Sequence, residues 1–129
     1  MYKLNSLEWW KAVAEAAQKD ERYIQYCKEL GRPLTLKFKI EVVDDKSILF
    51  TFENGRVVDI HEALPGEESD LGVKVTKDIL SRIVKGEYGL TYAATNKLLE
   101  VKGFVTLMQH AKPLIQMFEK VSRTIPCEF

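Results

Sequence analysis

The sequence predicts an α+β fold in which helices lie on one face of a five-stranded, mainly antiparallel sheet. Residues 34–60 alternate apolar and polar side chains, as in strands that bury only one face. Residues 6–30 and 104–121 instead carry apolar residues at helical spacing. The apolar face of the sheet requires a cover, and the helices are the elements available to provide it.

A helical arm is predicted over residues 6–30. Asn5 followed by Glu8 resembles the capping box that starts a helix, with Asn in place of the usual Ser or Thr. A second helical stretch follows Asp20, and Gly31 suits its left-handed end. The side chains expected to face inward are Leu7, Trp10, Ala14 and Ala17, followed by Tyr23, Tyr26 or Cys27, and Leu30.

Two tryptophans are adjacent in this arm. Because neighbouring residues point to different sides of a helix, at most one of Trp9 and Trp10 is expected to face the core. Trp10 shares a face with Ala14, whereas Trp9 joins Val13 and Ala16 on a second apolar stripe. Core packing is the simpler interpretation of both tryptophans, and a second subunit or a ligand over the Trp9 stripe is the alternative.

Four strands are predicted to follow as an antiparallel meander with one apolar face. The first covers residues 34–42 and the second covers 48–53. Asn54-Gly55 then gives a strong signal for a two-residue hairpin, because both residues tolerate a positive φ. A polar loop over 64–70 separates the third strand from the fourth. The apolar positions of these last two strands are Val58, Ile60, Leu71, Val73 and Val75.

The remainder of the chain predicts two short helices, a fifth strand and one long helix. The short helices cover 77–86 and 88–98, and the strand covers 98–103. The long amphipathic helix is predicted over 104–121 and contains Pro113, which removes a backbone donor and kinks or divides the helix at that point. A simple break is the preferred interpretation, and a hinge that lets the helix act as a lid from Pro113 onward is the alternative.

The composition predicts one domain over residues 1–129, with the helical arm at 6–30 and the sheet and its cover at 34–121. Lys plus Arg number 19 and Asp plus Glu number 19. Nucleic-acid binding and docking on anionic membranes both draw on excess positive charge, so the balance favours neither. There is no long apolar run of a membrane span and no signal-peptide core. We therefore expect no stable membrane insertion and a cytoplasmic location, in which Cys27 and Cys127 stay reduced.

No residue set has the spacing of a catalytic, metal or cofactor site. His61 is expected on the wet face of a strand and His110 on the last helix, and neither has a nucleophile or further metal ligands nearby. An enzyme would require a convergence that the sequence does not reveal, such as Tyr92, His110 and Glu119 at one pocket. The sequence thus favours a protein without catalytic residues, metal or cofactor.

Four segments of the chain follow a known family pattern. They are the hairpin 50–57, the step from strand to helix at 73–76, the helix end Ile83-Val84-Lys85-Gly86 and the strand Leu98-Leu99-Glu100-Val101-Lys102-Gly103. Together they resemble the sterol-carrier-protein-type (sterol carrier protein 2-like) lipid-binding domain family. Glu8-Trp9-Trp10-Lys11, with Asp20 and Tyr23, resembles the start of stand-alone prokaryotic members. Asn96 stands where many members carry Gly, and Asn also suits a left-handed helix end.

The resemblance implies an apolar cavity or tunnel between the sheet and its helical cover. It implies non-catalytic binding of a fatty acid, acyl-CoA, sterol or other lipid, with transport through local movement of a terminal helix. Plain packing on the sheet is the alternative interpretation of the last helix, and a protein-interaction or homodimerisation module with a filled core is the alternative function. The residues expected to contact the ligand are Trp10, Phe50, Ile83, Tyr88, Tyr92, Phe104, Met108, Leu114, Met117 and Phe118.

Overall fold

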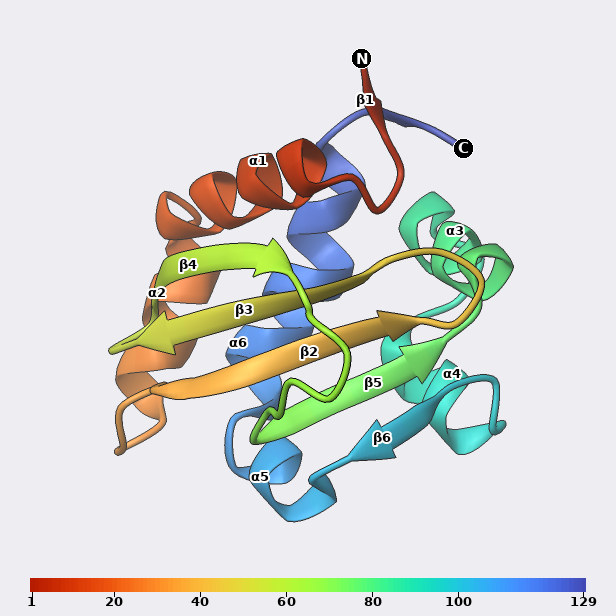
Figure 1. Cartoon of the computed structure of the whole chain (residues 1–129). Helices are drawn as coiled ribbons and strands as arrows, with labels where there is room; N and C mark the ends of the chain where they lie inside the picture. Colours follow the sequence, from red (N-terminus) through yellow and green to blue (C-terminus); the bar gives the residue numbers. More distant parts are fainter.

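The alternating segments form a five-stranded sheet, and the helices lie on one of its faces (Figure 1). The structure is a computed structural model that describes residues 1–129. The predicted α+β class is confirmed. The strands are β2 (Leu36–Val42), β3 (Ser47–Glu53), β4 (Arg56–Glu62), β5 (Leu71–Val75) and β6 (Glu100–Lys102).

The helical cover is built from the N-terminal segment and from the part of the chain that follows β5. Its members are α1 (Leu7–Gln18), α2 (Glu21–Glu29), α3 (Lys77–Lys85), α4 (Leu90–Thr95), α5 (Phe104–Gln109), α6 (Ala111–Ile115), the π-helical η1 (Gln116–Val121) and the 3₁₀-helical η2 (Ser122–Thr124). A short parallel pair that the sequence pattern does not predict joins the two termini, and it consists of β1 (Tyr2–Lys3) and β7 (Cys127–Glu128). None of the helices is both long and apolar enough to cross a membrane.

The strand order differs from the predicted meander. The order is β4-β3-β2-β5-β6, and β5 pairs with β2 in parallel, so that Phe38 lies opposite Leu71 and Val42 opposite Val75. The segment after β4 crosses the outer face of the sheet to reach this position (Figure 1). Asp70 fixes its end there, because its carboxylate accepts from the Lys37 amide at 2.8 Å and its own amide donates to the Lys37 carbonyl at 3.0 Å.

The hairpin between β3 and β4 is confirmed. Asn54 and Gly55 have φ values of 51° and 81°, as a two-residue turn with two positive φ angles requires. The Gly55 carbonyl also accepts from the Tyr23 hydroxyl at 2.7 Å, which ties the helical arm to this turn.

The cap of the first helix lies one residue beyond the predicted position. Ser6, not Asn5, accepts from the Trp9 amide, at 3.2 Å. Asn5 instead adopts a φ of 64°, and its side chain accepts from the Trp10 indole at 2.9 Å and donates to the Lys46 carbonyl at 3.0 Å. A buried indole N–H requires an acceptor, so the Asn5 side chain is committed to Trp10 and Ser6 is left to cap the helix.

Both tryptophans are fully buried, so the expectation that at most one faces the core was wrong. Trp10 packs against Phe50 and Phe118 on the sheet side of α1. Trp9 lies beneath the C-terminal segment, where its indole donates to the Ile125 carbonyl at 3.0 Å. The second apolar stripe is therefore covered by the chain itself.

The long C-terminal helix is broken at His110, three residues before the predicted position. Pro113 lies in the first turn of α6, where its missing amide has no intrahelical partner to lose. In a continuous helix the proline ring would clash with the carbonyl of Gln109, four positions earlier. The helix therefore ends at Gln109 and starts again at Ala111. The residues from Pro113 to Val121 are mostly buried, which agrees with the preferred interpretation of a simple break, and a hinge at this point stays an untested alternative.

The left-handed residue before β6 is Lys97, not Asn96. Lys97 has a φ of 58°, whereas Asn96 has a φ of −91° and its side chain donates to the Tyr92 carbonyl at 2.9 Å. The Asn96 side chain thus provides a hydrogen-bond donor for a carbonyl in the last turn of α4 while its own φ stays negative. The left-handed residue that turns the chain toward β6 is therefore the next one, Lys97. The predicted helix end at Gly86 is confirmed, and this residue is left-handed, with a φ of 86°.

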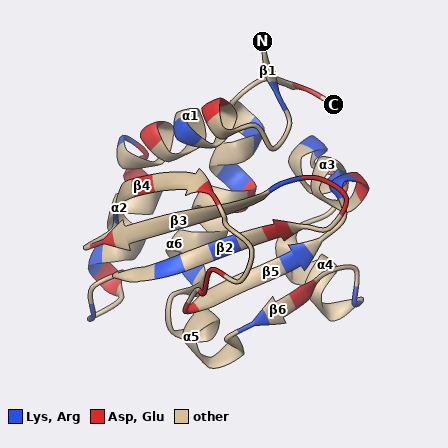
Figure 2. Cartoon of the chain, in the orientation of Figure 1, with Lys and Arg blue, Asp and Glu red and all other residues tan.

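Charged residues alternate with apolar ones along β2, as the strand pattern predicts, and Figure 2 shows these charged positions on the strand. On the outer face, the His61 ring contacts the carboxylates of Asp59 and Glu67, and Glu67 also accepts from the Leu64 amide at 3.0 Å. His61 therefore holds the beginning of the crossing segment against β4.

We expect His61→Gln to destabilise the protein more at acid than at alkaline pH. Hydrogen bonds to Asp59 and Glu67 raise the pKa of His61 above its usual value. A raised folded-state pKa adds stability that is complete below the unfolded value, near 6.5, and is lost as the pH rises through the folded value. The side chain is 40% exposed, so solvent screening keeps the effect below about 1 kcal/mol. Urea unfolding of the parent and the variant at about pH 5.5 and 9 measures the loss of stability at each pH. Equal losses at the two pH values would contradict this prediction.

Candidate functional site

An apolar pocket of about 290 Å³ lies between the sheet and the helical cover. Its volume is roughly twenty times the space that one water molecule requires. Twenty residues line it, and eighteen of them are hydrophobic. The floor is formed by inward-facing residues of three adjacent strands, namely Phe38 and Ile40 on β2, Val73 and Val75 on β5, and Val101 on β6.

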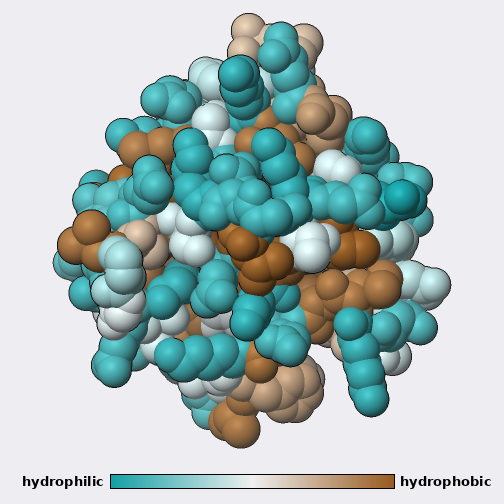
Figure 3. All heavy atoms as spheres, turned by 45° about the vertical axis from the view of Figure 1, so that its right-hand side comes forward, coloured by the Kyte–Doolittle hydropathy of each residue, from teal (hydrophilic) through white to brown (hydrophobic).

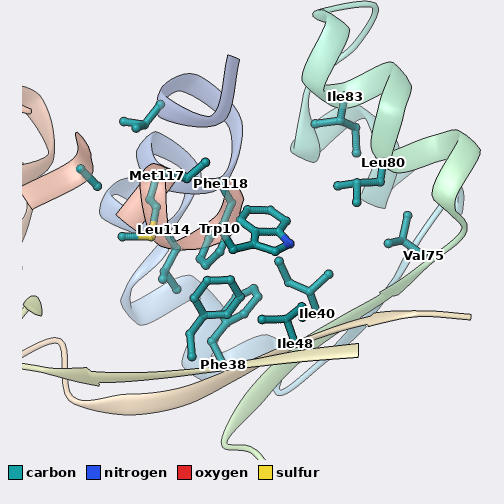
Figure 4. Packing of buried hydrophobic residues seen from close by; sticks show 14 of the residues in the cluster. Trp10, Phe38, Ile40, Ile48, Val75, Leu80, Ile83, Leu114, Met117 and Phe118 are labelled. Carbon is teal, nitrogen blue, oxygen red and sulfur yellow. The ribbon is translucent and has the colours of Figure 1, made fainter. Parts of the chain in front are cut away.

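The roof is formed by one side of α3 together with α4, α5 and the C-terminal helices. Thr76 caps α3 by accepting from the Ile79 amide at 3.3 Å, and Gly86 ends the helix. This fixes Leu80 and Ile83 over the pocket, where they point toward Ile40 and Trp10 (Figure 4). The other roof residues are Leu90, Thr91, Ala94, Thr95, Leu99, Phe104, Leu107, Met108, Ala111, Leu114, Ile115 and Phe118.

The far wall of the pocket is part of the aromatic core. Phe118 stacks on Phe38 with 4.6 Å between ring centroids and meets Phe50 edge-on at 5.0 Å. Trp10 lies 5.7 Å from the Phe118 ring (Figure 4). These large rings are held in place from several sides, so this wall of the pocket is rigid.

The exposed lining residues mark the opening of the pocket. They are Thr91 and Thr95 on α4, and Phe104 and Met108 on α5. β6 connects these two helices, so the opening lies on the β6 side of the molecule.

The two threonines at the opening are the only polar residues of the lining, and no charged side chain takes part. Burial of an unpaired charge costs far more than burial of an apolar group gains. The interior is therefore suited to a hydrocarbon group, and any charged group attached to it must stay at the opening.

Glu119 fastens α4 to the C-terminal helices. Its carboxylate accepts from the Leu90 amide at 2.6 Å and lies 3.0 Å from the Lys120 ammonium. Arg123 reaches the same region and donates to the Ile83 and Tyr88 carbonyls at 3.0 and 3.1 Å. Two side chains of η1 and η2 thus hold the end of α3 and the start of α4 in place over the pocket.

The pKa of Glu119 lies below its usual value despite burial. Burial alone raises the pKa of this carboxyl, but the Leu90 amide and the charges of Lys120 and Arg123 together outweigh that effect. Glu119 is therefore ionised at neutral pH, and its charge strengthens the hydrogen bond to α4.

The structure places six of the ten predicted contact residues in the pocket lining: Trp10, Ile83, Phe104, Met108, Leu114 and Phe118. The other four lie outside it. Phe50 and Met117 are fully buried in the core. The rings of Tyr88 and Tyr92 pack against each other at a tilt outside the pocket, with Tyr92 54% exposed. Whether any of these residues contacts a ligand stays a prediction.

The residues of the floor were not among the predicted contact residues. Phe38, Ile40, Val73 and Val75 were recognised as inward-facing strand positions but were assigned to the core alone. The alternation along the strands could have identified these residues, because it marks the face of the sheet that lies under both the core and the pocket.

The three residues considered for a catalytic site do not converge. Tyr92 is exposed, and the His110 ring contacts the Thr106 carbonyl at 2.8 Å. Glu119 is nine positions beyond His110, and its carboxylate instead accepts from the Leu90 amide at 2.6 Å. No group of three or more His, Cys, Asp or Glu side chains could hold a metal ion. Cys27 and Cys127 are free thiols.

Comparisons with known proteins identify the fold. No family model and no curated protein sequence matches the chain. Among solved structures, the crystal structure of sterol carrier protein 2 matches with a TM-score of 0.81 and 16% identity, over 96% of this chain and 100% of the other. A conserved hypothetical protein from Thermus thermophilus matches with a TM-score of 0.79 and 16% identity, over 99% of this chain and 93% of the other. The sterol carrier protein domain 2 of Helicoverpa armigera matches with a TM-score of 0.62 and 13% identity, over 94% of this chain and 91% of the other. The chain therefore has the fold of sterol carrier protein 2.

Proposed function

We propose that the protein binds the hydrocarbon part of a lipid in the pocket between the sheet and its helical cover, without a chemical step. The observation that carries the proposal is the lining, in which eighteen of twenty residues are hydrophobic and none is charged. Ligand pockets are typically concave and mostly apolar, with a few polar groups that fix the orientation of the ligand. The likeness to sterol carrier protein 2 supports the same proposal.

The position of the two threonines supports an orientation for the ligand. The apolar body lies inside, over Phe38 and Val75, and the polar end lies at the opening, near Thr91 and Thr95. A fatty acid, an acyl-CoA or a sterol meets this requirement, because each has one polar end and an extended apolar body. Each methylene removed from water contributes about 0.8 kcal/mol, so about ten buried methylenes yield a gross gain near 8 kcal/mol before ordering costs.

The alternative of a filled interaction module has less support. A core packed to the usual density leaves no void of this size, whereas the pocket here is open. Nothing in the comparisons supports a homodimer. Transport of the ligand is part of the proposal, and the exposed opening on α4 and α5 supports it because it gives the ligand a way in and out.

Purified protein should carry lipid or take it up. Native mass spectrometry before and after organic extraction would reveal a bound ligand, and a fluorescent fatty acid would be displaced by the extracted material. A mass equal to that of the protein alone, together with no binding of the fluorescent fatty acid, would contradict the proposal.

Ala94→Phe is expected to weaken binding of the fluorescent fatty acid at least tenfold. Ala94 lines the pocket on α4, and a phenyl ring there would exclude two or three methylenes of the ligand. That loss corresponds to about 2 kcal/mol, which exceeds a factor of ten in affinity.

The matched control is Ala12→Phe. Ala12 lies on a helix and is half-buried like Ala94, but it does not line the pocket. Binding of the fluorescent fatty acid by this variant should equal that of the parent, with unchanged circular dichroism for both variants. Equal binding by the two variants would show that the ligand lies elsewhere.

A further inference from the structure

α5 is the only helix of the cover without a buried residue. No hydrogen bond or ion pair joins residues 104–109 to any part of the chain beyond Gly103 and His110, the residues at the two ends of the helix. α4, across the opening, is instead fastened by the Glu119 carboxylate, which lies 2.6 Å from the Leu90 amide. One side of the opening is therefore fixed, and the other is held only through its ends and its apolar contacts.

Each end of α5 is a single residue outside the helical conformation. Gly103, before the helix, has a φ of 79°, and a Cβ there would lie 2.7 Å from the Asp70 carbonyl oxygen, so only glycine suits this place. His110, after the helix, has a φ of −129° and separates α5 from α6. Hinges are residues of this kind, which absorb a change in φ and ψ while the element between them moves as a unit.

The apolar side of α5 meets the pocket without being covered. Phe104 and Met108 lie one turn apart on one face of the helix, and both line the pocket although they are 63% and 61% exposed. Hydrophobic side chains reach the surface at the lower end of the molecule, where α5 lies (Figure 3). Apolar area that stays in water is unfavourable, and a hydrocarbon group in the opening would cover part of it.

We propose that α5 is a lid, which turns about Gly103 and His110 and closes over the hydrocarbon part of the ligand. The inference rests on the proposed function, because the ligand supplies the apolar surface against which Phe104 and Met108 become buried. Closure over an empty pocket gains less, so binding shifts the lid toward the closed position. The segment after the break places Leu114 and Phe118 in the core, so the movement is assigned to the segment before it.

The three methionines provide a test with two internal controls. Met1 is 84% exposed, Met117 is fully buried, and Met108 lies on the lid. Limited oxidation with hydrogen peroxide, followed by peptide mass spectrometry, should modify Met1 and Met108 in the free protein and spare Met117. Saturation with dodecanoic acid should slow the oxidation of Met108 at least fivefold, since closure removes the sulfur from water, and leave the rate at Met1 unchanged.

Pro113→Ala distinguishes movement of the lid from simple shielding by the ligand. Alanine lets the helix continue through His110, which removes one of the two hinges, and Pro113 does not line the pocket. Circular dichroism should show more helix, and the rates of association and dissociation of a fluorescent fatty acid should both fall about fivefold, with little change in Kd. Pro65→Ala, in an exposed loop, is the matched control and should leave both rates unchanged.

Met108→Asn and Val105→Asn test the lid even if the helix of Pro113→Ala stays broken. Both residues are exposed on α5, but Val105, which is 70% exposed, does not line the pocket. Met108→Asn should speed dissociation of the fluorescent fatty acid about tenfold, because the closed lid loses one apolar contact with the ligand. Val105→Asn should leave the rate of dissociation unchanged.

The outcomes separate the lid from the proposed function. Binding of the fatty acid with no protection of Met108 would overturn the lid and leave the proposed function intact, as would equal effects of Met108→Asn and Val105→Asn. A continuous helix in Pro113→Ala with the exchange rates of the parent would also overturn the lid alone. Absence of fatty-acid binding by the parent protein would overturn the proposed function, and the lid with it.

Discussion

Phe118→Ala is expected to lower the free energy of unfolding by about 3–5 kcal/mol. The Phe118 ring contacts Trp10, Phe38, Phe50 and Phe52, and only 4% of the residue is exposed. Truncation removes the apolar area of the ring and leaves a void, because the surrounding rings are held by the sheet and by α1. A typical domain has about 5–15 kcal/mol of stability, so the loss is a large share of the total.

Phe104→Ala is the matched control, since it removes the same side chain from an exposed position. Phe104 is 63% exposed, and we expect its loss to cost less than about 1 kcal/mol. Urea unfolding of both variants gives the comparison, with the slope of the transition checked for equality. Similar losses in the two variants would show that the aromatic cluster is not the centre of the core.

Phe118 also connects stability to the proposed function, because one side of its ring faces the pocket. Phe118→Ala should therefore widen the pocket as it weakens the core. The same residue serves as core and lining because the inner face of the sheet is shared between them, with Phe38 in both sets.

Local patterns predicted the elements that depend on neighbouring residues. Asn54-Gly55 and Gly86 adopt the positive φ angles that their types favour. The alternation over residues 34–60 assigned the inner face of β2 and β3 correctly, since strand periodicity decides which side of a sheet a residue faces.

Features that depend on distant parts of the chain were not accessible from these patterns. The parallel pairing of β5 with β2 brings Asp70 to the Lys37 backbone, 33 positions earlier in the chain, and alternation says nothing about which strand lies beside which. Burial of Trp9 depends on the Ile125 carbonyl, which comes from the other end of the chain. The cap at Ser6 depends on competition for Asn5, and helical spacing does not reveal it.

The pocket was predictable in its chemistry and not in its extent. Helical spacing placed Leu114 and Phe118 on an inner face, and the same spacing applies to Met117, which packs in the core. Whether an apolar side chain meets a neighbour or an empty space depends on the distance between sheet and roof. That distance is set by contacts such as the one between Glu119 and Leu90, which join residues far apart in the sequence.

Glu119→Ala is expected to lower the free energy of unfolding by about 2–3 kcal/mol at neutral pH. The substitution leaves the Leu90 amide without its charged acceptor and removes the partner of Lys120. Glu15→Ala is the control, because Glu15 forms an exposed ion pair with Lys19 that should contribute less than about 1 kcal/mol.

The effect of Glu119→Ala should also depend on pH. The folded-state pKa of Glu119 is lowered, so its contribution is complete above the unfolded value, near 4.5, and is lost as the pH falls through the folded value. Urea unfolding of the parent and the variant should therefore converge in strongly acid solution. A difference that stays constant from neutral to acid pH would contradict an ionised carboxylate at this position.

Gly89→Ala tests the same contact from the other side. A Cβ at Gly89 would lie 2.5 Å from the Glu119 carboxylate, which must then leave the Leu90 amide. The φ of −92° suits alanine, so the backbone itself adds no strain. We expect Gly89→Ala to destabilise the parent by about 1–2 kcal/mol, but to be neutral or stabilising by about 0.5 kcal/mol in the Glu119→Ala background, where only the entropy of the unfolded chain changes. The parent, the two single variants and the double variant form a double-mutant cycle, in which a shared contact appears as an interaction energy. Equal effects of Gly89→Ala in the two backgrounds would mean that the Glu119 carboxylate does not hold α4.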